Sequence, residues 1–307
     1  MSVIGIDTSN YTTSIAFFDG ISGENCSRLL PVKRGELGLR QSDAVFAHTK
    51  SLPELSGRLF SHMEARKITA IGVSTRPRAV EGSYMPCFLV GYSHAKLLSN
   101  AFGVPLVEVS HQQGHVAASV WSAGHMELLE QPHLAWHLSG GTTELLLVEP
   151  EGKNVKCTRI GGTTDISAGQ LIDRTGQMLQ LPFPSGKQLD VLSREARLRE
   201  CFKVRCKDMS FSLSGVQNKV QQFYEAHNVP AETAAYALRC VSEAVIQATE
   251  QAMKAYPGLR IVFSGGVASN SMLRELTAPL NPIFAQPQFS TDNAMGVAVL
   301  ACRATED

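Results

Sequence analysis

Two histidines, His111 and His115, follow a short apolar run that ends near Val109. On a helix, residues four apart project from the same face, so both imidazoles would point in one direction. With a carboxylate from elsewhere in the chain, they could form a two-histidine, one-carboxylate site for iron(II) or zinc acting as a Lewis acid. Taken alone, two helical histidines are more often surface or core residues than ligands. The zinc-peptidase motif would require Glu where Gln112 stands, so a peptidase mechanism of that type has no general base.

Three Gly/Ser/Thr-rich turns, each after an expected strand, indicate a nucleotide site. They cover residues 8–12, 139–143 and 264–270. Without bulky side chains, backbone N–H groups can approach phosphate oxygens, and the N-terminus of an adjoining helix favours the anion. Any one of the turns could instead be a tight hairpin whose glycines only supply positive φ. Three in this order favour nucleotide binding.

Two charged segments allow both a functional and a structural interpretation. In residues 164–174, Thr164 or Asp165 could cap a helix that carries Asp173 two turns in. A carboxylate such as Asp173 could accept hydrogen bonds from ribose or substrate hydroxyls, and the alternative is a solvated helix face. Residues 194–207 form the most basic part of the chain and could meet RNA phosphates. The acidic residues interspersed among them favour a solvated helical face.

The composition fits a folded protein of one large or two ordinary domains, with 307 residues, 44% of them hydrophobic. It excludes a disordered chain. No apolar run reaches the roughly 18 residues of a membrane span, and no basic region precedes an apolar core at the N-terminus, so we expect a soluble cytoplasmic protein without a membrane partner. Seven scattered cysteines without a C-x-x-C pair argue against a disulfide framework and a thiolate zinc site. With 28 basic and 28 acidic residues, the chain would need a local patch or a partner to bind nucleic acid.

Alternating strands and helices predict an α/β fold. Residues 3–18 are typical of a β-hairpin, and residues 134–148 repeat the same pattern, which indicates a weak internal duplication. The other expected strands are residues 71–74, 104–109 and 261–264. The expected helices are residues 52–64, 85–102 and 231–255, one that starts near Ser271, and a last one capped by residues 290–293 that ends near Arg303.

Together these motifs resemble, over nearly the whole chain, the tRNA threonylcarbamoyladenosine transferase family. This glycoprotease family was once labelled O-sialoglycoprotein endopeptidase and belongs to the superfamily of actin, sugar kinases and heat-shock chaperone ATPases. The matching motifs occur in the family's order. They are Gly5-Ile6-Asp7-Thr8-Ser9, His111-x-x-Gly114-His115, Ser139-Gly140-Gly141-Thr142, Asp165 through Asp173, Pro184-x-Gly186, Phe211-Ser212-x-Ser214-Gly215, Ser264-Gly265-Gly266-Val267-Ala268-x-Asn270 and Asp292-Asn293.

The resemblance implies an actin-like ATPase (ribonuclease H-like) fold of two duplicated domains with a nucleotide and metal cleft between them. The expected domains are residues 1–110 and 111–307, with the last helix, about 292–305, packing back on the first domain. The resemblance further implies one divalent metal, iron(II) or zinc, held by His111, His115 and Asp292. It implies an adenylate or ATP-type nucleotide held by His137, Leu138, Ser139, Gly140, Gly141, Asp173, Gly186, Asp190 and Asn270. No catalytic side chain is assigned.

The function implied by the resemblance is a metal-dependent acyl transfer. The exocyclic amine of a tRNA adenosine beside the anticodon attacks the carbamoyl carbon of threonylcarbamoyl-adenylate, and AMP leaves. Polarisation of the carbonyl and stabilisation of negative charge are the physical demands, which a metal and backbone donors can supply. The family also implies tRNA as a partner, together with a smaller related actin-fold subunit and an ATPase subunit.

The chain departs from the family's pattern at several positions, which suggests a divergent paralogue. Where the family usually continues with Cys-Asp-Glu, this chain has Asn10, Tyr11 and Thr12. Gln113, Ile166 and Gln170 replace further acids, and residues 76–78 replace a Gly-Pro-Gly turn. Two alternatives therefore stand beside the transferase: a carbamoyl- or phosphoryl-transfer enzyme with another acceptor, and a non-catalytic nucleotide-binding partner subunit. The three retained presumed ligands favour an enzyme, and a metallopeptidase comes last.

Overall fold

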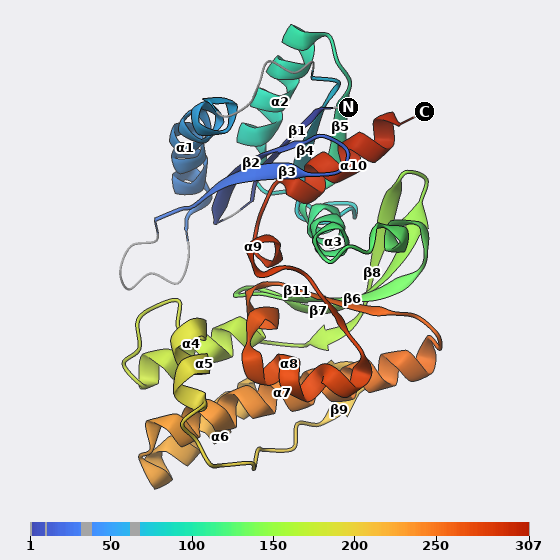
Figure 1. Ribbon diagram of the computed structural model, residues 1–307. Coiled ribbons are helices and arrows are strands. Elements are labelled where there is room, and N and C mark those ends of the chain that lie inside the picture. The colour runs from blue at the N-terminus through green and yellow to red at the C-terminus, as the bar shows by residue number, and fades with distance from the viewer. Residues whose placement is uncertain (1, 10, 32–38, 62–67, 307) are drawn as a thin grey trace. The chain divides into compact units, whose positions relative to one another are not determined.

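The structure is a computed structural model that describes residues 2–9, 11–31, 39–61 and 68–306 (Figure 1). The chain divides into two compact units. Unit 1 consists of Met1–Gln131, Glu149–Cys157 and Asp292–Asp307, and unit 2 of Pro132–Val148 and Thr158–Thr291. The first unit therefore runs past the boundary expected at residue 110, and it takes in the end of the chain.

The sheet of unit 1 has five strands in the order β3-β2-β1-β4-β5. The strands are β1 (Val3–Thr8), β2 (Thr12–Phe18), β3 (Gly23–Leu29), β4 (Ala70–Arg76) and β5 (Leu106–Ser110). β1 pairs antiparallel with β2, which confirms the predicted hairpin, and parallel with β4. Both strands of the hairpin are buried, as their apolar runs require.

The helices of unit 1 are α1 (Gln41–Ser61), α2 (Phe88–Phe102), α3 (His111–Ser122) and α10 (Met295–Thr305), with a 3₁₀ helix, η1 (Met126–Glu130). α1 begins earlier than the predicted start at residue 52, and Pro53 lies inside it. A continuous buried face through Ala44, Leu52 and Leu59 explains the longer helix. The predicted end at Glu64 lies outside the described residues.

Helix α10 packs against the strands β1 and β4 and against α3 (Figure 1). Its residues from Met295 to Cys302 are all buried, so it is a core helix. The sheet approaches it closely because Gly5 and Gly72 have no side chain: a Cβ on Gly5 would overlap Ala298. The helix begins at Met295, later than the predicted cap at residues 290–293, and Asn293 Oδ1 accepts the hydrogen bond of the Met295 N–H at 3.0 Å.

The sheet of unit 2 has seven strands in the order β12-β11-β6-β7-β8-β10-β9. They are β6 (His133–Leu138), β7 (Thr143–Glu151), β8 (Asn154–Thr163), β9 (Cys206–Lys207), β10 (Ser210–Phe211), β11 (Ile261–Ser264) and β12 (Ile283–Phe284). Five neighbours, β8-β7-β6-β11-β12, repeat the strand order of unit 1, and β6 is antiparallel to β7 and parallel to β11. The predicted internal duplication is therefore confirmed by the topology.

The helices of unit 2 include the predicted long one, α7 (Pro230–Ala255), whose buried face covers Trp136 and Phe263 of the sheet. Trp136 Nε1 donates to Thr249 Oγ1 of α7 at 2.8 Å, so the indole nitrogen is paired in the core. The others are α4 (Ala168–Met178), α5 (Gly186–Ser193), α6 (Ser214–His227), η2 (Gly266–Ser269), α8 (Ser271–Thr277), η3 (Ala278–Leu280) and α9 (Pro287–Ser290). Among the described helices, none has the length and apolar character of a membrane span.

The basic segment 194–207 is not a helical face, so that prediction is wrong. α5 ends at Ser193, and residues 198–205 have no regular secondary structure. The backbone N–H groups of Arg197 and Leu198 donate to the two carboxylate oxygens of Glu232 on α7, at 3.0 and 2.9 Å. These hydrogen bonds satisfy backbone N–H groups that would otherwise pair within a helix, and they hold the segment against α7.

Candidate functional site in unit 1

The two histidines lie in the first turns of α3, which a capping box begins at Ser110. Ser110 Oγ accepts from the Gln113 N–H at 3.2 Å, and Gln113 Oε1 accepts from the Ser110 N–H at 2.8 Å. The cap fixes the start of the helix directly after β5. As the spacing predicted, His111 and His115 lie on one helix, with ring centroids 4.4 Å apart.

Gln113 is one of the departures from the family's acids, and its contacts show what the amide does. It is buried, and its Nε2 donates to the carbonyl oxygen of Val155 at 2.7 Å. An ionised glutamate could serve in the capping box, but it has no N–H for that carbonyl. The amide thus fixes α3 to residues 149–157 of the same unit without adding a negative charge.

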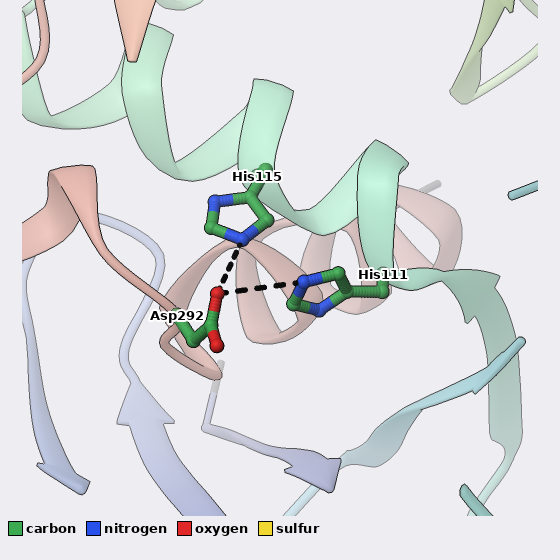
Figure 2. A group of neighbouring side chains, drawn as sticks. All are labelled: His111, His115 and Asp292. Carbon is green, nitrogen blue, oxygen red and sulfur yellow. Dashed lines mark hydrogen bonds and ion pairs between the residues drawn. The ribbon is translucent and has the colours of Figure 1, made fainter. Parts of the chain in front are cut away.

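Asp292, which precedes α10, reaches both imidazoles (Figure 2). Its Oδ1 lies 3.0 Å from Nε2 of His115 and 3.6 Å from Nε2 of His111. One ligand atom from each of the three residues lies within 4.8 Å of the others. The side chain of His115 is 3% exposed and that of Asp292 is 26% exposed, so the cluster is partly open to solvent.

Asp7, at the end of β1, orients His111 from the other side. Its Oδ2 accepts from Nδ1 of His111 at 2.7 Å, and its Oδ1 accepts from Ser74 Oγ at 2.6 Å. Ser9 Oγ donates to Asp292 Oδ2 at 3.4 Å. No role for Asp7 follows from its sequence motif alone. The available signal was a carboxylate inside an otherwise apolar strand, because such a group is rarely buried unless it is paired.

The charges of the cluster determine the protonation of His111. Burial lowers the pKa of His111, but the carboxylates of Asp7 and Asp292 outweigh burial and raise it to about 10. Burial acts to raise the pKa of Asp292, and the hydrogen bonds and charges of the two imidazoles hold it well below its ordinary value. His111 and Asp292 thus stabilise each other in their charged forms.

The predicted nucleotide-binding turn at residues 139–142 lies in unit 2, between β6 and β7. Ser139 Oγ accepts from the Thr142 N–H at 3.1 Å and holds the turn closed. Ser167, the cap of α4, donates to the carbonyl oxygen of Gly140 at 2.6 Å. Gly140 and Gly141 are exposed, while His137 and Leu138 are buried in the strand before them. The two glycines therefore leave their backbone accessible.

The remaining predicted nucleotide residues form two contacting groups in unit 2. Asp173 Oδ1 accepts from the Ser185 N–H at 2.8 Å, which ties it to the residue before Gly186, and burial raises its pKa. Asp190 Oδ1 accepts from Asn270 Nδ2 at 3.0 Å and from Ser271 Oγ at 2.7 Å. Asp173 is therefore half-buried and does not lie on a solvated helix face, which was the alternative interpretation of this residue.

Neither Thr164 nor Asp165 caps α4, so that prediction is wrong. Ser167 is the cap, in a second capping box with Gln170. Asp165 instead accepts from Ser214 Oγ at 2.6 Å and from the Leu213 N–H at 2.8 Å, and it also accepts from Ser212. It anchors the turn before α6. Ser167 is the N-cap because its hydroxyl oxygen accepts the hydrogen bond of the Gln170 N–H.

The environment of Asp165 predicts an acid-sensitive contribution to stability. Burial raises its pKa, but the hydrogen bonds from Ser212, Ser214 and Leu213 outweigh burial and hold the pKa below its ordinary value of 3.8. Because the folded pKa is the lower one, the ionised carboxylate stabilises the fold above about pH 4 and loses this effect as the pH falls through the folded pKa. We expect Asp165→Asn to unfold at a lower urea concentration than the parent at pH 7. The difference between the two urea midpoints should narrow below about pH 4. A difference in urea midpoint that stays constant down to pH 3 would contradict a lowered pKa of Asp165 in the folded protein.

Solved structures share this architecture. HypF, in a phosphate- and nucleotide-bound form, superposes with a TM-score of 0.64 at 14% identity, over 100% of this chain and 47% of HypF. The chain thus spans about half the length of HypF. Component A of (R)-2-hydroxyglutaryl-CoA dehydratase from Acidaminococcus fermentans gives a TM-score of 0.58 at 15% identity, over 99% and 100% of the two chains. The predicted actin-like ATPase fold of two duplicated halves is confirmed.

Sequence comparisons give the family. The family model described as tRNA N6-adenosine threonylcarbamoyltransferase matches residues 38–299. A protein of that name from Carboxydothermus hydrogenoformans is 31% identical over 310 residues, which cover 96% of this chain and 90% of the relative. The match includes both histidines of α3, Asp292 and the turn at residues 139–142. The chain belongs to the tRNA N6-adenosine threonylcarbamoyltransferase family.

Proposed function

We propose that this protein is a metal-dependent transferase that moves the threonylcarbamoyl group from threonylcarbamoyl-adenylate to the exocyclic amine of a tRNA adenosine. Membership of the family supports the reaction class. The observation that carries the metal dependence is the convergence of His111, His115 and Asp292, whose ligand atoms lie within 4.8 Å of one another. A subunit that only binds nucleotide would have no evident need for this cluster.

The cluster fits a divalent metal ion. Two ligand atoms that each lie about 2.1 Å from one ion are about 3.0 to 3.4 Å apart at octahedral to tetrahedral angles. The two imidazole nitrogens lie 3.0 and 3.6 Å from the carboxylate oxygen of Asp292, close to these values. Imidazole and carboxylate donors suit iron(II) or zinc. The hydrogen bond from His111 to Asp7 directs the other ring nitrogen, Nε2, toward Asp292.

In this proposal, the residues of the chain bind and orient the adenylate. A bound divalent metal supplies a Lewis acid for an oxygen of the substrate. The exposed backbone of Gly140 and Gly141 offers N–H groups to the phosphate, and Asp173 and Asn270 hold the adenosine. The amine nitrogen forms a bond to the carbamoyl carbon, the bond from that carbon to the phosphate oxygen breaks, and the amine loses a proton as AMP leaves.

Reconstitution tests the proposal. The purified protein is analysed for metal and incubated with threonylcarbamoyl-adenylate and unmodified tRNA, and modified adenosine is measured by nucleoside mass spectrometry. The assay is run with and without the partners that the family implies, a smaller actin-fold subunit and an ATPase. Modified adenosine with bound metal supports the proposal. Bound metal without modified adenosine indicates another acceptor, and the absence of both indicates a non-catalytic partner subunit.

Asp7 gives a prediction specific to metal positioning. Asp7→Asn keeps the size of the side chain but removes the charge that orients His111. We expect metal affinity to fall about 10- to 100-fold, as for other groups that orient a metal-bound histidine. Calorimetric titration of the metal-free protein with zinc measures this loss of metal affinity. Ser22→Ala, which removes an exposed hydroxyl bonded to Asp19, should bind zinc like the parent. Equal affinities for the parent and Asp7→Asn would remove Asp7 from the site.

A further inference from the structure

A cavity of about 230 Å³ lies in unit 2, where the end of α5 meets α7 and α8. It is lined mainly by polar groups, and three arginines contribute to its walls. The side chains that matter for its chemistry are Ser193, Arg194, Arg199, Arg239, Ser271 and Glu275. These residues come from three separate parts of the chain, so the fold brings the arginines together although only Arg194 and Arg199 are near in sequence.

The arginines carry unused hydrogen-bonding capacity. Arg239 Nε is buried and has no hydrogen-bond partner within the described part of the chain. A buried donor without a partner is destabilising, and an acceptor bound in the cavity would offset this cost. Arg199 is exposed and makes no ion pair with any described residue. Arg194 is paired, with Nη2 3.2 Å from Asp190 Oδ2.

The cavity wall carries more positive than negative charge. Against the three arginines stands one carboxylate, Glu275, among the described lining residues. The two serine hydroxyls are not available as donors, because Ser193 Oγ donates to the Asp190 carbonyl oxygen and Ser271 Oγ to the Asp190 carboxylate. Guanidinium groups therefore determine what this cavity binds, and their planar N–H forks match the oxygens of phosphate and carboxylate groups.

We propose that this arginine cavity binds the phosphoryl group of a small anionic ligand. A phosphate monoester offers three terminal oxygens and up to two charges, so it can bond several guanidinium groups at once, whereas a carboxylate offers two oxygens and one charge. A compact ligand fits better than an RNA backbone, because Arg239 is recessed in the cavity and RNA phosphates are met by exposed side chains. The proposal does not depend on the transferase activity or on the metal cluster of unit 1.

Calorimetric titration with inorganic phosphate at constant ionic strength tests the cavity. We expect the parent protein to bind phosphate, and Arg239→Gln to weaken binding about tenfold or more. Arg239→Lys should fall between the two, since it keeps the charge but loses the fork. Arg199→Gln should also weaken binding, and because Arg199 is exposed, this variant stays informative if changes at Arg239 disturb folding.

The matched control is Arg174→Gln on α4, an exposed arginine whose Nη1 bonds Gln217 at 2.6 Å away from the cavity lining. It should bind phosphate like the parent. Phosphate binding that is absent, or equal in the parent, Arg239→Gln and Arg199→Gln, would overturn the proposal. Unchanged phosphate binding with weaker, less salt-dependent tRNA binding in these variants would instead assign the arginines to RNA.

Discussion

Replacing His115 with alanine is expected to remove bound metal from the protein and to abolish threonylcarbamoyl transfer. His115 is buried and supplies a nitrogen 3.0 Å from Asp292 Oδ1, so its loss leaves one imidazole and one carboxylate. Metal affinity should fall by more than the roughly 10- to 100-fold typical of changes that only disturb the orientation of a ligand. Metal analysis of the purified variant, followed by zinc titration of its metal-free form, measures the effect. His111→Ala should behave in the same way.

Nucleotide binding distinguishes this effect from misfolding. The residues proposed to hold the adenosine, Asp173 and Asn270, lie in unit 2, so a folded His115→Ala protein should bind AMP almost as the parent does. His125→Ala is the matched control, because His125 is partly exposed and pairs with Glu127 outside the cluster. It should keep both metal and activity. Unchanged metal content in His115→Ala and His111→Ala would refute the proposed metal site.

Replacing Gly296 with alanine is expected to cause a large loss of stability from a single methyl group. Gly296 of α10 faces Gly114 of α3, and a Cβ would overlap the Gly114 carbonyl oxygen and crowd the Ala118 N–H. Backbone atoms cannot rotate away as a side chain can, so the two helices must separate. Such overpacking in a core costs about 3 kcal/mol. Urea denaturation should show a lower midpoint with a similar slope.

Gly57→Ala provides the opposite case with the same substitution. Gly57 is an exposed residue of α1, and a Cβ there would meet no atom within 4 Å. Alanine favours the helical backbone over glycine by about 1 kcal/mol, so this variant should be more stable than the parent. Equal stabilities of Gly57→Ala and Gly296→Ala would show that α10 and α3 do not pack as closely as described.

The order of elements in the fold could be predicted from the sequence because the local patterns agree with the tertiary structure. The hairpins at residues 3–18 and 134–148 and the helix at 230–255 combine clear apolar runs with turn residues at their ends. The start of α1 was placed at residue 52 instead of Gln41, although the buried face of the helix already includes Ala44 and His48. Residues 194–207 were misread because the acidic residues interspersed among the basic ones favoured a helical face, while hydrogen bonds to the Glu232 carboxylate hold Arg197 and Leu198 outside a helix.

The candidate site could be predicted only as far as local spacing and family resemblance extend. The spacing of His111 and His115 indicated one helix face, and the resemblance supplied Asp292 as the third ligand. Asp7 was missed because its partner follows 104 positions later in the chain, and no local pattern reports such a pair. The arginine cavity could not be predicted for the same reason: Arg239 meets the segment after α5 only in the folded unit.

The position of α10 in unit 1 has a consequence for how the protein is made. On the ribosome, the five-stranded sheet and α3 emerge early, while Asp292 follows His115 by 177 positions. Until residues 292–305 leave the exit tunnel, the sheet surface around Gly5 and Gly72 is uncovered and the two histidines lack their carboxylate. Unit 1 therefore completes its fold only after unit 2 has been synthesised, although β1 is translated before unit 2. Until then, the uncovered apolar surface of the nascent chain is exposed to aggregation.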